Sequence, residues 1–305
     1  MSVILVADTL ETAREIIGYL DGQTVRDRLE LVIATESREE LALDEAACSG
    51  FHSTQVVEVE SIAYVQPPRV AAIRAARAPL VFIAETHCFP EPESLEALIE
   101  RHRGPWQVVG QMVLNANPGS AISWANVLMD YGPQMAGTPG GEVDQVASHN
   151  ASYKRQALLE VGDELGSLLE AGDVLHKALV ARGGRLFLED RARTAHLNVS
   201  RPGPWVRERI ADGRSYASRR AKDWPVTRRA IYVLGAPLIP FVRLARIRTY
   251  VRRTTPPPQM ARFYPTLFGG LCVSALGELI GYAFGTGTSM VTVCEMELHR
   301  RQYVR

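Results

Sequence analysis

The stretch Leu80-Val-Phe-Ile-Ala-Glu-Thr-His-Cys-Phe-Pro90 joins a short apolar run to an acid and an imidazole. Pro79 and Pro90 bound this stretch, and its β-prone apolar residues are typical of a strand buried on both faces. Because side chains alternate along a strand, Glu85 and His87 are predicted to point to the same side at its end. Ligands bind at the carboxyl ends of strands in open α/β sheets. A carboxylate and an imidazole at that edge can hold a divalent ion.

Apolar strand patterns and helical patterns alternate on both sides of this stretch. Strands are expected at Val3–Ala7, Leu29–Ala34, Thr54–Val59 and Trp106–Leu114. Helices are expected between them at Thr9–Leu20, Glu39–Ala47, Arg69–Ala76 and Pro92–His102. This alternation predicts an α/β fold with a doubly wound, mostly parallel sheet.

Turn signals become more frequent after Asn115, and the elements become less regular. The pattern predicts a helix at Ile122–Met129, a strand at Gln145–Tyr153 and a helix at Glu164–Ala181. Gly183 follows the second helix, where a C-terminal cap is expected. Two short strands, Arg185–Leu188 and Arg193–Asn198, complete this part of the chain.

Charge divides the chain of 305 residues, although its formal net charge is zero. Residues 201–253 contain fourteen Lys or Arg and three acids, whereas residues 1–200 contain sixteen basic and twenty-eight acidic residues. We therefore expect a catalytic domain at 1–200 and a basic region at 201–305, of which only the second meets an anionic surface. The four cysteines show no zinc-motif or disulfide spacing, which favours a reduced cytosolic setting. The amino terminus has the pattern of a first strand rather than of a signal peptide.

Apolar stretches adjoin the basic residues of the second part. Trp205–Trp224 is predicted to be an arginine-rich amphipathic helix, and prolines interrupt Ile231–Val242, which is too short to span a bilayer. Phe263–Gly285 has the length of a membrane helix, but it contains Glu278. This combination favours a membrane partner over nucleic acid, because arginines beside apolar runs are attracted to an anionic leaflet. The expected location is the cytoplasmic face of the inner (plasma) membrane.

Residues 1–200 resemble the nucleotide-sugar half of family 2 glycosyltransferases with a GT-A fold. In that family a strand ends in Asp-x-Asp with a proline three residues later, and here Glu85-Thr86-His87 precedes Pro90. The run from Asp173 through Gly183 to His196 is similar to the family's acidic helix, short strand and late histidine. Two departures are clear: neither acid of Asp-x-Asp is aspartate, and Ala171-Gly172 stands in place of the usual Glu-Asp pair. Glu-x-His with a membrane segment is similar to a bacterial, membrane-associated type.

The resemblance implies an inverting glycosyltransferase that moves a sugar from a nucleotide-diphosphate sugar to a hydroxyl acceptor. The implied setting is envelope or exopolysaccharide synthesis, with a glycan or lipid-linked acceptor. Glu85 and His87 would hold Mn²⁺ or Mg²⁺ at the diphosphate, and His196 would be a third ligand or a phosphate contact. Asp173 would be the base that takes the acceptor's proton, with Glu170 as its substitute.

The other candidate residues line the expected cleft. Asp8 and Glu36 follow the first two strands and would bind the nucleoside, whereas His149 and Asn150 would line the acceptor side. Arg74 is a candidate for the positive group on the helix before the metal strand. Each of these residues also has a structural interpretation: a strand-end hydrogen bond, a solvated helix charge or a core histidine.

Two alternatives remain open for the function. The altered motif and the missing Glu-Asp pair are also consistent with a catalytically inactive GT-A module that acts as a binding or assembly subunit. A nucleotidyltransferase is the weaker alternative, because Ala7-Asp8-Thr9-Leu10 lacks a glycine-rich, basic loop.

Overall fold

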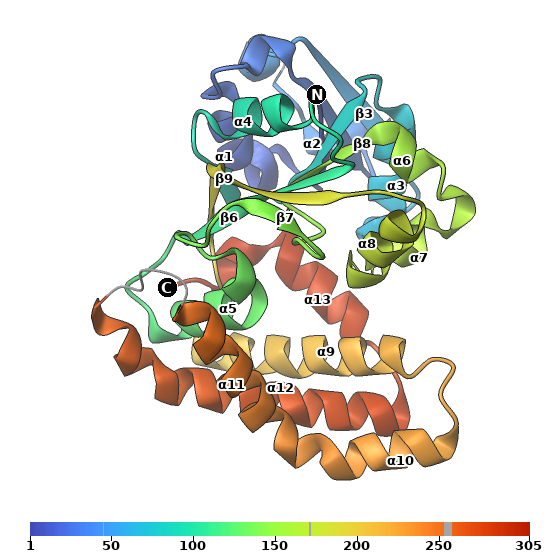
Figure 1. Cartoon of the computed structure of the whole chain (residues 1–305). Coiled ribbons are helices and arrows are strands. Elements are labelled where there is room, and N and C mark those ends of the chain that lie inside the picture. Colours follow the sequence, from blue (N-terminus) through green and yellow to red (C-terminus); the bar gives the residue numbers. More distant parts are fainter. Residues whose placement is uncertain (45, 171, 253–257) are drawn as a thin grey trace. The chain divides into compact units, whose positions relative to one another are not determined.

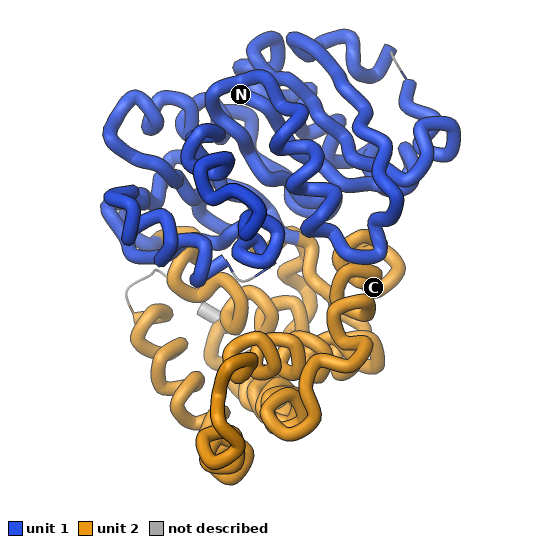
Figure 2. The backbone as a smooth tube through the Cα atoms, turned by 90° about the vertical axis from the view of Figure 1, so that its right-hand side faces the viewer, with its two compact units in different colours: residues 1–114, 138–196 blue, residues 115–137, 197–305 orange. Residues whose placement is uncertain are grey.

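The computed structural model describes residues 1–44, 46–170, 172–252 and 258–305 (Figure 1). The chain divides into two compact units, coloured separately in Figure 2. Unit 1 contains residues 1–114 and 138–196, and unit 2 contains residues 115–137 and 197–305.

One sheet forms the centre of unit 1, and within the described residues it has nine strands. Its order is β3-β2-β1-β4-β8-β6-β9-β5, and β7 pairs with β9 off this path. The strands are β1 (Ser2–Val6), β2 (Glu30–Thr35), β3 (Ser53–Glu58), β4 (Leu80–Ile83), β5 (Cys88–Pro90), β6 (Val108–Asn115), β7 (Gly141–Val143), β8 (Ala151–Lys154) and β9 (Leu186–His196).

The first half of the sheet is parallel, and the second half is antiparallel. β1 pairs in parallel with β2 and β4, in register from Ser2 opposite Glu30 and Val81. β8 is antiparallel to both β4 and β6, and β9 is antiparallel to β5 and β7. The α/β class is therefore confirmed, and the strands become antiparallel where the regular alternation with helices ends.

The helices of unit 1 cover this sheet. They are α1 (Leu10–Asp21), α2 (Arg38–Leu41), α3 (Gln66–Ala75), α4 (Ser94–Arg101), α6 (Arg155–Leu159), α7 (Leu165–Glu170) and α8 (Gly172–Ala181). Thr9 caps α1 as expected, since its hydroxyl accepts a hydrogen bond from the Thr12 N–H. α1 and α4 contribute Ile16 and Leu98 to one core with alternate residues of β1 and β2. This packing holds the parallel strands, and their carboxyl ends lie together at one edge.

Three expectations for residues 145–198 differ from the structure. The strand predicted at Gln145–Tyr153 begins only at Ala151, because the left-handed backbone of Asn150 breaks the extended run. The helix predicted at Glu164–Ala181 consists of α7 and α8. The two strands predicted at 185–198 are one long strand, β9, which pairs with both β7 and β5.

Unit 2 is helical, with a core of its own. Its helices are α5 (Ala121–Tyr131), α9 (Pro202–Arg220), α10 (Val226–Gly235), α11 (Ile239–Val251), α12 (Tyr264–Phe284) and α13 (Ser289–Leu298). The sequence placed α5 in the first domain, but Ala125 and Leu128 of α5 share a core with Leu267 and Leu271 of α12. Unit 2 therefore contains 115–137 in addition to the carboxyl-terminal part of the chain.

Helices α9 and α12 approach each other closely at glycines. A Cβ atom on Gly213 would lie 2.2 Å from the Ser274 carbonyl oxygen, and one on Gly277 would lie 2.3 Å from that of Ile210. Both distances are shorter than van der Waals contact, so these positions require glycine. The arginine-rich helix predicted at Trp205–Trp224 is therefore α9, and it packs along α12, which is the apolar helix predicted at Phe263–Gly285.

Among the residues that the structure describes, two helical segments are long and apolar enough to cross a membrane, Val226–Val251 and Met260–Phe284. The segment Val226–Val251 corrects the expectation that Ile231–Val242 is too short to span a bilayer. Pro237 and Pro240 do not end the helical run, because each occupies a first-turn position of a successive helical segment. In their most apolar windows 17% of the first segment and 50% of the second is buried.

Candidate functional site

A tight turn follows β4 and carries the acid and the imidazole. β4 ends at Ile83, and the Cys88 N–H donates a 3.3 Å hydrogen bond to the Glu85 carbonyl oxygen. The expectation that strand alternation aligns Glu85 with His87 is therefore wrong, because both residues lie beyond the strand. The turn nevertheless brings them together: His87 Nε2 lies 3.9 Å from Glu85 Oε2.

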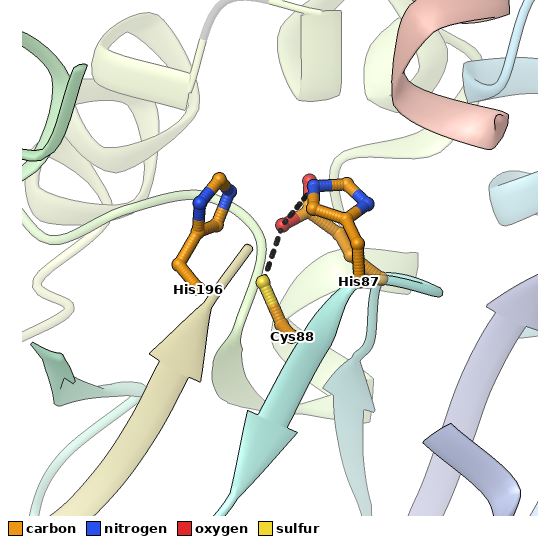
Figure 3. A group of neighbouring side chains, drawn as sticks. His87, Cys88 and His196 are labelled. Carbon is orange, nitrogen blue, oxygen red and sulfur yellow. Dashed lines mark hydrogen bonds and ion pairs between the residues drawn. The ribbon is translucent and has the colours of Figure 1, made fainter. Parts of the chain in front are cut away.

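The strand after the turn adds a cysteine and brings His196 to the same place. Cys88 and His196 are directly opposed on the antiparallel strands β5 and β9, so their side chains lie on one face of the sheet. The labelled side chains of His87, Cys88 and His196 converge in Figure 3. Among the described residues, one ligand atom from each of Glu85, His87, Cys88 and His196 lies within 4.8 Å of each of the others. All four side chains are buried.

Glu85 is the centre of the contacts around this cluster. Asn150 Nδ2 donates to Glu85 Oε2 at 2.5 Å and lies 3.0 Å from Cys88 Sγ. His149 Nε2 lies 3.5 Å from Glu85 Oε1, and the Arg69 guanidinium lies 3.9 Å from the same oxygen. The structure thus places His149 and Asn150, predicted for the acceptor side, directly against the carboxylate.

The backbone of Asn150 is held in an uncommon conformation. Its φ is 54°, in the left-handed region that asparagine tolerates better than most residues. Its N–H donates to the Ile83 carbonyl oxygen at 2.7 Å, which fixes it to the end of β4. The Tyr153 hydroxyl donates to the Ser148 carbonyl oxygen at 2.7 Å, so the preceding segment is also tied down. Asn150 is therefore positioned to orient both Glu85 and Cys88.

The acidic helix begins beside this segment. A Cβ atom on Gly172 would lie 2.3 Å from the Ser148 Cβ atom, so the start of α8 packs on the loop before Asn150. Asp173 follows in the first turn, where its carboxylate lies 3.0 Å from Lys177 Nζ and is 40% exposed. Glu170 ends α7 and is partly buried.

The buried side of α8 carries a neutral histidine, His176. Burial lowers the pKa of His176 to about 4, so its imidazole is neutral at pH 7. Its Nε2 atom lies 3.2 Å from the Tyr153 hydroxyl, which also bonds to Ser148. The first turn of α8 and the Ser148–Asn150 segment therefore share a buried hydrogen-bonded support.

The two candidate nucleoside residues lie at the same edge of the sheet as Glu85. Asp8 follows β1, and its carboxylate accepts a 2.7 Å hydrogen bond from the Thr9 N–H. Glu36 follows β2, is exposed, and accepts a 2.7 Å hydrogen bond from the Ile62 N–H. Both carboxylates therefore organise loops at the carboxyl ends of parallel strands.

Two residues of the site were missed by the sequence reasoning. Cys88 was treated as part of the run after the strand, and the structure places it in the cluster opposite His196. Arg69 is 7% exposed on α3, in a stripe with Ala72 and Ile73 at helical spacing, and this spacing was the available signal. The arginine chosen instead, Arg74, lies on the surface with Asp163 at 3.4 Å.

The cluster has the chemistry of a divalent-metal site. A carboxylate, two imidazoles and a thiol, all buried and close together, are ligand types that first-row transition metals bind. The Asn150 amide contacts two of the four candidate ligands, as outer-shell groups do in metal centres. The residues present therefore fit a bound ion, which could polarise a phosphate or carbonyl oxygen.

The sequence matches no family model and no curated protein. Solved structures with a similar fold include the mannosyltransferase PcManGT from Pyrobaculum calidifontis in complex with GDP-Man and Mn²⁺, at 15% identity and a TM-score of 0.54 over 98% of this chain and 87% of that one. S. aureus TarS 1–349 in complex with UDP has 17% identity and a TM-score of 0.51 over 99% and 91% of the chains. Its complex with UDP-GlcNAc gives 17% identity and a TM-score of 0.50 over 99% and 92%. The neighbours are glycosyltransferases, and the likeness confirms the GT-A-like fold expected from the sequence.

Proposed function

We propose that this protein is an inverting glycosyltransferase that moves a sugar from a nucleotide-diphosphate sugar to a hydroxyl acceptor. The observation that carries the proposal is the buried group of Glu85, His87 and His196 at the carboxyl edge of the parallel strands. In a GT-A-like fold, that edge is suited to a ligand, and a divalent ion there would meet the donor's diphosphate.

The donor would be held from two directions. Glu85, His87 and His196 would bind Mn²⁺ or Mg²⁺, which neutralises the negative charge that develops on the leaving diphosphate. Arg69 lies close to Glu85 and adds a fixed positive charge beside the same group. Asp8 and Glu36 end the neighbouring strands and would accept hydrogen bonds from the nucleoside.

The acceptor would be activated from the helix α8. Asp173 would take the hydroxyl proton as the acceptor oxygen attacks the anomeric carbon, and Glu170 is the substitute at the end of α7. The support for Asp173 is that α8 begins against Ser148, next to His149 and Asn150. Its contact with Lys177 lies on the surface and is weak, so the acceptor hydroxyl can replace it.

The test is sugar transfer by the purified full chain with Mn²⁺, Mg²⁺ or Zn²⁺ in parallel, over a panel of nucleotide sugars and hydroxyl acceptors. Asp173→Asn is expected to lower the turnover number by about 100-fold or more, since a general base contributes roughly that much. Asp163→Asn is the matched control, because Asp163 is an exposed acid whose carboxylate pairs with Arg74 on the surface. Equal turnover in the Asp173→Asn variant would remove Asp173 as the base.

Glu85→Gln separates the enzyme from the inactive alternative. The enzyme loses transfer when this ligand is lost, because its charge and its contacts with Asn150 both change. An inactive binding module shows no transfer in the wild-type chain with any donor of the panel. Transfer that is equal in wild type and Glu85→Gln would contradict the proposed site.

We further propose that unit 2 binds the cytoplasmic face of the inner (plasma) membrane, where a lipid-linked or envelope glycan acceptor would be reached. Apolar side chains recur every three or four residues along α10, the short 3-10 helix Ala236–Leu238 and α11, and they are strongly exposed: Ile231 67%, Leu234 82%, Leu238 66% and Phe241 61%. An exposed apolar stripe of this kind is suited to the lipid interface.

Cations and aromatic rings flank this stripe. The Arg228 guanidinium lies 4.0 Å from the centroid of the Trp224 ring, and Trp224 packs against Tyr232 with centroids 4.5 Å apart. Aromatic residues of this kind are enriched at the level of lipid headgroups. Arginines near an anionic leaflet are attracted by about 1 kcal/mol each.

Co-sedimentation with vesicles tests the membrane proposal. The wild-type chain is expected to bind vesicles that contain phosphatidylglycerol more strongly than neutral vesicles. The double variant Leu234→Glu/Phe241→Glu is expected to stay in the supernatant, since both side chains are exposed and their replacement leaves the core intact. Val174→Glu, an exposed apolar position on α8, is the control. Equal sedimentation of the double variant and the control would refute the role of the stripe.

A further inference from the structure

We infer that Cys88 is a fourth metal ligand and that its thiolate makes the site selective for Zn²⁺ over Mn²⁺ and Mg²⁺. This inference deepens the proposed metal site and rests on it, but it does not require sugar transfer. Cys88 is 1% exposed and stands directly opposite His196 in the β5–β9 ladder. The strand pairing therefore fixes the Cα–Cβ bond of Cys88 on the face of the sheet that carries His196.

The distances fit a shared ion. Cys88 Sγ lies 3.2 Å from Glu85 Oε2. Two ligands of a tetrahedral zinc ion, with bonds of about 2.0 Å to oxygen and 2.3 Å to sulfur, are about 3.5 Å apart. The sulfur and the carboxylate oxygen are thus already separated roughly as two ligands would be. The His87 and His196 rings are edge to face, with centroids 4.8 Å apart, so the two imidazoles face the cluster from different directions.

Asn150 supplies the outer shell for this arrangement. Its amide nitrogen is within hydrogen-bond distance of both Cys88 Sγ and Glu85 Oε2. A donor within reach of a sulfur and a carboxylate oxygen can hold both in orientation toward a shared ion.

The donor set then decides the metal. Carboxylate and water suit Mg²⁺ and Mn²⁺, whereas a thiolate with two imidazoles suits Zn²⁺ and Co²⁺. Four protein ligands also satisfy the tetrahedral preference of Zn²⁺. Cys88 therefore sets which ion occupies the site, while Glu85 and the two histidines would bind any of them.

Co²⁺ is the probe, because a thiolate bound to Co²⁺ gives a ligand-to-metal charge-transfer band in the near ultraviolet. The full-length chain with one equivalent of Co²⁺ is expected to show this band, and Zn²⁺ is expected to remove it at lower concentration than Mn²⁺. Cys88→Ser is expected to lose the band and to bind Zn²⁺ at least about 10- to 100-fold more weakly, since even outer-shell losses cost that much. Cys48→Ser, another buried cysteine of unit 1, is the control and keeps the band.

Two further measurements keep the outcomes distinct. Cys88→Asp retains an anionic ligand and is expected to bind Mn²⁺ and Zn²⁺ with more similar affinities, which serves as the test if Cys88→Ser does not fold. Binding of Co²⁺ to the wild-type chain without the thiolate band, or tighter binding of Mn²⁺ than of Zn²⁺, would overturn the inference. The band is recorded without donor or acceptor, so a chain that shows it but transfers no sugar refutes the proposed function alone.

Discussion

Replacing Asn150 by glycine separates the two things that this residue does in the site. Its amide contacts Glu85 Oε2 at 2.5 Å and Cys88 Sγ at 3.0 Å, and its backbone has a φ of 54°. Asn150→Gly removes the amide but keeps a backbone that adopts this φ without strain. Asn150→Ala removes the same amide and adds a Cβ atom in the left-handed region.

The expected magnitudes follow from these contacts. Loss of an outer-shell partner lowers metal affinity by about 10- to 100-fold, or about 1.4 to 2.7 kcal/mol, and both variants should show it. Left-handed backbone costs an alanine about 1 to 2 kcal/mol, partly offset by about 0.4 to 1 kcal/mol because alanine restricts the unfolded chain. Asn150→Ala should therefore unfold about 1 kcal/mol more easily than Asn150→Gly.

Two assays check this pair of variants. Competition with a chromophoric chelator gives the Zn²⁺ affinity, and urea unfolding without metal gives the free energy of unfolding. If Asn150→Gly binds Zn²⁺ as tightly as the wild type, the amide does not orient the ligands. If the two variants are equally stable, the backbone at 150 is not left-handed in solution.

Two further predictions concern unit 2. Gly277→Ala is expected to lower the free energy of unfolding by about 1 to 3 kcal/mol, because its Cβ atom would meet the Ile210 carbonyl oxygen. Gly269→Ala on the same helix is the control. Its Cβ atom meets no atom within 4 Å, so this variant should be neutral or stabilising. Thermal and urea unfolding of the two variants compare them directly, and equal loss in both would refute the close helix approach. Burial, with the nearby carboxylates of Glu208, Asp130 and Glu297, raises the pKa of Asp212 to about 7 against the pull of Arg209. Since the native state then keeps a proton that the unfolded state has lost, this group makes stability fall as pH rises from 3.8 to about 7. Asp212→Asn should remove that part of the pH dependence. The free energy of unfolding of the variant minus that of the wild type should therefore rise between pH 3.8 and about 7 and stay constant above that range. A stability difference that does not change with pH would contradict the raised pKa.

The sequence was most informative where local pattern and tertiary packing agree. The strands of the parallel half and the Thr9 cap of α1 were placed to within a few residues, because period-two apolar runs and capping chemistry are local. Glu85, His87 and His196 were predicted to share a site, and the structure brings them together.

The remaining features depended on contacts that are distant in the chain. Cys88 lies opposite His196, which is more than one hundred residues later, so only the β5–β9 pairing shows that the two belong together. Arg69 was passed over for Arg74, although its helical spacing with Ala72 and Ile73 places it on the buried face of α3, whereas Arg74 lies on the surface. The segment with α5 was assigned to the first domain because nothing local shows that α5 completes the core around α12.

The central claim is that a divalent ion on Glu85, His87 and His196 holds the diphosphate of a nucleotide sugar. Calorimetric titration of the full chain with UDP and GDP, with and without added metal, tests it most directly. The predicted result is binding of at least one nucleotide that requires the ion and is lost in His196→Ala. Binding of equal strength without metal, or in the His196→Ala variant, would contradict the claim.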